Sequence, residues 1–204
     1  MTTESATALA KSELRASVRA AIDAVPPAVR LERSAAACQR AMDLLCPDGE
    51  GQPVSRVMLF APMPDELNVD PLVSALLAEG VDVYLPRCDW DAKAMVPVRV
   101  HSLDGLTEVR PGLREPEAEG PVCPVSALDA VIVPGVAFAA AATGGVGRVG
   151  RGGGFYDRFL GQQDLRARTV GVAFDEQIVD EVPMEPHDIS LSAAVTPTRV
   201  IGRA

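Results

Sequence analysis

Hydrophobic residues recur with helical spacing near the N-terminus. Within residues 8–25, Leu14, Val18 and Ile22 lie four residues apart, the spacing of one face of an amphipathic helix. The segment "PPAVRLERSAAACQRAMDLL" at residues 26–45 predicts a second helix, with proline tolerated in its first turn. We therefore expect two N-terminal helices, followed by a loop at "CPDGEGQP".

Farther along the chain, strand-like and helix-like segments alternate. "VSRVMLFAP" predicts a strand, "VDPLVSALLAEG" a helix and "VDVYLP" a second strand, which together make a βαβ unit. "LDAVIVPG" is a continuous apolar run, typical of a parallel strand buried on both faces. "AMVPVRV" and "TVGVAF" predict further strands, and the proline-rich "EPEAEGPVCPVS" an irregular segment. The pattern indicates an α/β fold with a mainly parallel sheet.

Composition narrows the class of protein. The 204 residues are 48% hydrophobic, enough for a single core, and the net charge is -9. An acidic chain argues against non-specific binding to nucleic acid or to an anionic membrane. The four cysteines form no C-x-x-C pair, and the N-terminus carries no apolar leader segment. We expect a soluble, cytoplasmic monomer of one domain, residues 1–204, that acts on small molecules.

One short stretch interrupts this acidic chain. "GGVGRVGRGGGFYDR" holds seven glycines and three arginines between Gly144 and Arg158. Gly145, Gly147 and Gly150 satisfy G-x-G-x-x-G, but they do not directly follow a strand as a dinucleotide fingerprint requires. An RGG-type RNA-binding segment is also disfavoured, because "RGGGF" occurs as a single copy. A flexible surface loop remains open as an alternative.

The interpretation that we favour is an anion cradle. Successive glycines can aim several backbone N–H groups at one point, and a helix that begins near Phe155 adds its positive end. Arg148 and Arg151 supply guanidinium groups suited to phosphate oxygens. Asp157 follows closely, where a carboxylate could hold Mg²⁺ against the same phosphates.

The same residues resemble a known family. "VPGVAF" followed by "GRVGRGGGFYDRFL" is similar to the signature of 5-formyltetrahydrofolate cyclo-ligases. Weaker similarities follow in the family's order: "KSELR", "FAPMPDELNVDPL", "REP" and "FDEQIVDEVPMEPHDISL". The resemblance covers most of the chain, and the glycine motif is its most specific part.

The resemblance implies a fold and a reaction. The fold is a three-layer α/β sandwich related to the phosphosugar-isomerase and CoA-transferase architecture, with N-terminal helices at residues 7–46 packing over the nucleotide site. The reaction is the ATP- and Mg²⁺-dependent conversion of 5-formyltetrahydrofolate to 5,10-methenyltetrahydrofolate, with release of ADP and phosphate. Such phosphoryl transfer depends on positioning and charge neutralisation more than on protein nucleophiles.

The resemblance also implies site residues. Catalytic roles fall to Arg148, Arg151 and Tyr156. The ATP contacts are Lys11, Arg15, Arg148, Gly150, Arg151, Gly152, Gly153, Gly154, Phe155 and Tyr156. The folate contacts are Ala61, Met63, Glu66, Arg151, Gly152 and Tyr156. The Mg²⁺ ligands are Asp157 and Asp188.

Some positions depart from the family pattern. Residues 138–148 are about four residues longer than usual and carry Ala139 where an aspartate is common. Ser192 also replaces an aspartate, and Phe155 replaces a tyrosine. Two alternatives therefore stay open: a non-catalytic folate- or nucleotide-binding member of the same fold, and an enzyme that acts on another formamide or carboxylate.

Overall fold

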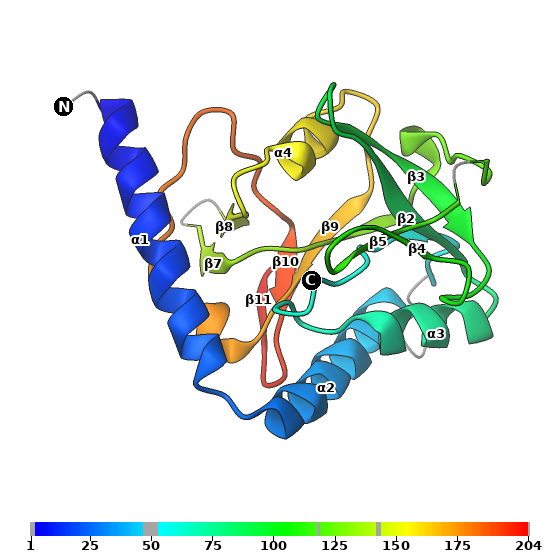
Figure 1. The fold of residues 1–204 in the computed structure, drawn as a ribbon, viewed down its shortest axis with the longest axis horizontal. Coiled ribbons are helices and arrows are strands. Elements are labelled where there is room, and N and C mark those ends of the chain that lie inside the picture. The colour runs from blue at the N-terminus through cyan, green and yellow to red at the C-terminus, as the bar shows by residue number, and fades with distance from the viewer. Residues whose placement is uncertain (1–2, 47–52, 118, 142–143, 204) are drawn as a thin grey trace.

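A seven-stranded sheet runs through the centre of the computed structural model (Figure 1), which describes residues 3–46, 53–117, 119–141 and 144–203. Its strand order is β11-β10-β9-β6-β1-β2-β3. The strands are β1 (Arg56–Met58), β2 (Asp82–Asp89), β3 (Ala94–Val100), β6 (Ala130–Val133), β9 (Arg168–Val172), β10 (Ala193–Val195) and β11 (Val200–Gly202). The five inner strands are parallel, and β3 and β11 run antiparallel at the two edges. The predicted α/β class with a mainly parallel sheet is confirmed.

The predicted helices are also present. They are α1 (Thr3–Asp23), α2 (Pro27–Leu45), α3 (Asp70–Ala78) and α4 (Phe155–Leu160), with 3₁₀ turns η1 (Val125–Ala127) and η2 (Asp175–Gln177). α2 begins at its proline, whose missing N–H has no intrahelical partner at that position in any case. α3 connects β1 to the parallel neighbouring strand β2, which confirms the βαβ unit.

Two hydrophobic cores lie on opposite faces of the sheet. Side chains alternate along each strand, so Val57 packs with α1, α2 and α3 on one face, while Met58 packs with α4 on the other. Strand β6 is buried along its whole length and contributes to both cores, as its continuous apolar run predicts. The molecule is therefore layered, with helices on each side of the sheet.

Two short hairpins were not predicted from the sequence. One joins β4 (Thr107–Arg110) to β5 (Leu113–Glu115), and the other joins β7 (Ala137–Ala140) to β8 (Val146–Val149). The second hairpin leads directly into the glycine stretch and α4. Both hairpins border the cavity described below.

All four cysteines are free thiols. Among the described residues, no helix has the length and apolar character that crossing a membrane requires.

Candidate active site

The glycine stretch forms one wall of a cavity of about 700 Å³ between β8 and α4. Gly152 and Gly154 have φ values of +99° and +70°, which residues with a Cβ rarely adopt. The backbone N–H groups of residues 151–154 donate to no acceptor among the described residues. A row of unpaired donors at a cavity suits an anion. Because α4 has only six residues, the backbone amides and arginines matter more here than a helix dipole.

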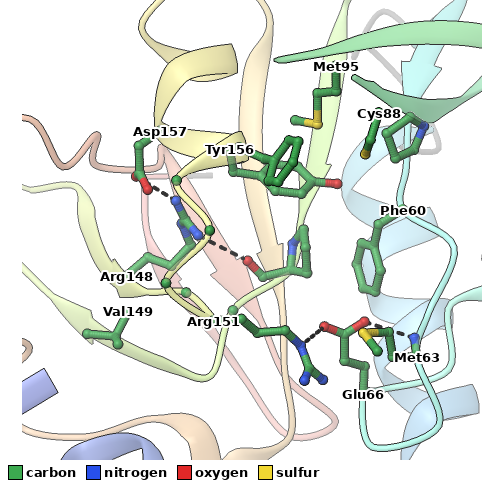
Figure 2. A pocket seen from close by; sticks show the side chains of 18 of the residues that line it. Phe60, Met63, Glu66, Cys88, Met95, Arg148, Val149, Arg151, Tyr156 and Asp157 are labelled. Atoms are coloured by element: carbon green, nitrogen blue, oxygen red, sulfur yellow. Dashed lines mark hydrogen bonds and ion pairs between the residues drawn. The ribbon is translucent and has the colours of Figure 1, made fainter. Parts of the chain in front are cut away.

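Arg148 lies under this wall and is 5% exposed. Its Nη2 donates to Asp157 Oδ1 at 2.6 Å and its Nη1 to the carbonyl oxygen of Pro134 at 3.5 Å (Figure 2). Its Nε has no partner among the described residues. A phosphate or metal ion that reaches this point would therefore compete with an existing ion pair, and a direct phosphate contact from Arg148 stays a prediction.

Helix α1 closes another side of the cavity. Lys11 is 8% exposed, and its Nζ donates to Asp188 Oδ2 at 2.6 Å and to Glu185 Oε2 at 2.7 Å. Arg15 Nε donates to the carbonyl oxygen of Gly150 at 2.7 Å. Both cations expected to contact ATP thus lie at the cavity. Of the two N-terminal helices, only α1 contributes described residues to the lining, and packing over a nucleotide site stays a prediction.

The Lys11–Asp188 pair perturbs both of its members. Burial by itself would lower the pKa of Lys11, but hydrogen bonds to Asp188 and Glu185 outweigh it, and the pKa is raised. Burial would raise the pKa of Asp188, but Lys11 outweighs it, and the pKa is lowered. Both groups are therefore charged at neutral pH.

The loop after β1 faces the glycine stretch across the cavity. Glu66 accepts hydrogen bonds from Arg151 Nε at 2.8 Å and from the Met63 N–H at 2.9 Å (Figure 2). Arg151 Nη2 also contacts Asp65 Oδ1 at 2.5 Å. Ala61 and Met63 line the same region. Arg151 therefore joins the residues expected to contact folate to those expected to contact ATP.

Tyr156, in the first turn of α4, lines the cavity. Its hydroxyl is buried and has no hydrogen-bond partner among the described residues. Burial raises the pKa of this hydroxyl far above its usual value, so the group stays protonated. It is a free donor at the position where sequence reasoning expected a ligand-contacting ring.

Sequence reasoning missed a further wall, formed by Cys88, Trp90, Met95, Arg110 and Glu115. Glu115 is 5% exposed and accepts a hydrogen bond from the Cys88 N–H at 3.2 Å. Burial and this carboxylate raise the pKa of the Cys88 thiol to about 12, so Cys88 does not serve as a thiolate nucleophile. The only sequence signal for this wall was "REP", which contains Glu115.

Several carboxylates at the cavity fit a divalent cation. Asp157 and Asp188 both line it, and Asp157 Oδ2 accepts no hydrogen bond from the described residues. Ligand atoms of Glu185, His187 and Asp188 lie within 4.8 Å of one another, and this group does not include Asp157. Mg²⁺ prefers oxygen donors together with substrate phosphates, so the donor set suits it. Glu185, which sequence reasoning missed, stands three residues before Asp188.

The departures from the family pattern have structural counterparts. Phe138 and Arg148 face each other in the β7–β8 hairpin, so Arg148 sits in a paired strand; residues 142–143 lie outside the described residues. Ala139 is buried opposite Gly147. Ser192 lies beside Thr169 and does not line the cavity. Ser192 therefore forms hydrogen bonds with strand β9.

Comparisons with known proteins agree on one family. A model described as the 5-formyltetrahydrofolate cyclo-ligase family matches residues 7–197. The 5-formyltetrahydrofolate cyclo-ligase of Escherichia coli (strain K12) is 37% identical over 71% of this chain and 79% of its own. That of Mycolicibacterium smegmatis is 32% identical over 94% of this chain and 95% of its own. The structure of Aquifex aeolicus 5,10-methenyltetrahydrofolate synthetase matches with a TM-score of 0.77 and 29% identity, over 94% and 92% of the two chains.

Proposed function

Because this chain belongs to the 5-formyltetrahydrofolate cyclo-ligase family, we propose that its cavity holds 5-formyltetrahydrofolate and ATP together. The chain is an enzyme with the cyclo-ligase activity of that family, and family membership implies that it uses ATP. What we add is the assignment of the two substrates to the two sides of the cavity.

The observation that carries this assignment is the position of Arg151. It belongs to the glycine stretch, whose N–H groups are free for phosphate oxygens, and it bonds Glu66 at 2.8 Å on the facing loop. A folate bound near Glu66 and a triphosphate bound over residues 150–154 would therefore meet beside one guanidinium group. Arginine suits that position because its charge is permanent and its donors are directional.

The reaction at that meeting point needs few protein groups. The formyl oxygen attacks the γ-phosphorus and the bond to ADP breaks; N10 then attacks the formyl carbon, loses its proton, and phosphate leaves. Negative charge moves onto the leaving oxygens, and positioned donors lower the cost of that change. Arg151, Lys11 and residues 151–154 line the cavity, which supports this role for their charges and backbone amides.

Two carboxylates would hold the metal ion that accompanies the nucleotide. We assign Mg²⁺ to Asp157 and Asp188, both of which line the cavity. The ion would neutralise phosphate charge when bound. Within the protein, Asp157 is now paired with Arg148 and Asp188 with Lys11, so ligand binding would redistribute these ion pairs.

A direct assay tests the proposed function. Purified protein with 5-formyltetrahydrofolate, ATP and Mg²⁺ should form methenyltetrahydrofolate, which is followed by its absorbance, and one equivalent of phosphate per product. Omitting Mg²⁺, with a chelator present, should abolish product formation. Folate binding without ATP turnover would instead identify a non-catalytic member, and phosphate release only with another formamide or carboxylate would identify a different substrate.

A further inference from the structure

The cationic side chains that line the cavity differ in one respect. In the described residues, five have a hydrogen-bonded acceptor: Lys11 with Asp188, Arg15 with the Gly150 carbonyl, Arg114 with Asp70, Arg148 with Asp157, and Arg151 with Glu66. Arg110 also lines the cavity, but its guanidinium makes no hydrogen bond or ion pair with the described residues. It is therefore the lining guanidinium whose donors are all available to an anion, among the described residues.

Arg110 is nevertheless held in place. Its Cζ lies 3.7 Å from the centroid of the Trp90 ring, a close cation–π contact. Trp90 is 36% exposed, and its ring meets that of Phe155 edge-on at 5.0 Å. The guanidinium of Arg110 thus packs on Trp90, and Trp90 in turn packs against Phe155, the first residue of α4.

The position of Arg110 separates it from the other anion-binding groups. Lys11 and Arg15 come from α1, on one side of the molecule, whereas Arg110 ends β4 on the opposite side (Figure 1). Its charge also reaches the thiol of Cys88, whose pKa it tends to lower. The β4–β5 hairpin also approaches the loop that carries Glu66, because a Cβ added at Gly112 would lie 2.7 Å from Pro64. Arg110 therefore belongs to the folate end.

We propose that Arg110, stacked on Trp90, binds a carboxylate of the glutamate tail of the folate substrate. This inference rests on the proposed function. A folate carries a pterin, an aryl ring and a glutamate with two carboxylates, and a chain of net charge -9 offers that dianion few favourable positions. Arginine pairs with carboxylates through two parallel hydrogen bonds, and the triphosphate has its own donors on the other side of the cavity.

Two ligands that match in shape but differ in charge test the proposal. We would measure, by calorimetry, binding of 5-formyltetrahydrofolate and of its diamide, in which both glutamate carboxylates are carboxamides. Arg110→Gln should weaken binding of the acid by about 10-fold, the scale of one charge-assisted contact, and leave the diamide within about 2-fold. Arg110→Lys should recover part of the loss, and Trp90→Leu should reproduce it in weaker form.

Controls decide between the alternatives. Arg30→Gln makes the same change in net charge on α2, away from the cavity. It should change the affinity for neither the acid nor the diamide. An equal loss for acid and diamide, a loss confined to ATP, or no loss at all would each overturn the proposal. Product formation by the wild-type protein tests the proposed function separately, because the binding comparison requires no turnover. If the wild-type enzyme were active but Arg110→Gln weakened binding of the acid no more than binding of the diamide, this inference would be refuted and the proposed function would stand.

Discussion

At the scale of single residues, the buried Lys11–Asp188 pair makes stability depend on pH. The folded-state pKa of Asp188 is lowered, so its contribution is present above the unfolded value, about 4, and is lost as pH falls through the folded value. The folded-state pKa of Lys11 is raised, so its contribution is present below about 10.4 and is lost as pH rises through the folded value. The pair should stabilise the fold between these limits.

We therefore expect Lys11→Met to be less stable than the wild-type protein across the neutral range, because it leaves two partly buried carboxylates without their cation. The difference in free energy of unfolding should be constant from about pH 5 to 10 and shrink below about pH 4 as the carboxylates take up protons. Urea titrations at a series of pH values measure it. A difference that grows in acid would contradict the assignment.

The charged residues of the cradle should dominate turnover. Asp157→Asn and Arg151→Ala should each lower kcat by about 10² to 10³, the scale for losing one preorganised charge contact in a water-poor site. Asp65→Asn is the matched control: it removes one partner of Arg151 but keeps the bond to Glu66, and its effect should stay below about 10-fold. Full activity in both cradle variants would show that the cavity is misassigned.

At the scale of elements, one buried amide fixes the turn on which the site is built. Gln177 ends η2 and donates to the carbonyl oxygens of Gly135 and Val136 at 2.7 and 3.1 Å, while its own oxygen accepts from the Phe174 N–H at 2.8 Å. Val136 leads directly into β7. The amide therefore connects the end of β6 to the hairpin that carries Arg148.

Gln177→Leu should remove these three bonds and leave buried backbone groups unpaired, at a cost of about 3 kcal/mol in the free energy of unfolding. Denaturant titration measures that loss, and Gln162→Leu provides a control because Gln162 is exposed. If the two substitutions lowered the free energy of unfolding equally, the hydrogen bonds of Gln177 would not contribute specifically to stability.

The sequence predicted those elements whose pattern is local. Residues 130–133 form a fully apolar strand because β6 is buried on both faces, and α4 begins at Phe155 after its run of glycines. The β4–β5 and β7–β8 hairpins escaped prediction because strands of three or four residues show no clear alternation. The wall with Trp90 and Arg110 was missed because it exists only where the β2–β3 hairpin approaches the β4–β5 hairpin, a contact that no local pattern reveals.

At the scale of the whole molecule, one sheet is shared by two cores. Adjacent residues of the same strand, such as Val57 and Met58, belong to opposite cores, so neither core can be lost without disrupting the other's strands. The cavity lies between elements from both ends of the chain, from α1 to the segment around Asp188. Ligand binding should therefore stabilise the entire fold rather than a part of it.

This coupling gives a prediction for thermal unfolding. ATP with Mg²⁺ at about 100 times its Kd should add about 2.7 kcal/mol of stability by mass action, which for a chain of this size corresponds to a rise in Tm of about 5 to 10 °C. Fluorescence of Trp90, the single tryptophan, reports on the cavity wall, and far-ultraviolet circular dichroism reports mainly on the helices. Both signals should shift together. AMP, which lacks the phosphates that the amides of residues 151–154 would bind, should shift them far less. If the fluorescence transition moved while the circular dichroism transition kept its midpoint, the two cores would be unfolding independently. Ligand binding would then stabilise the cavity wall without stabilising the helices.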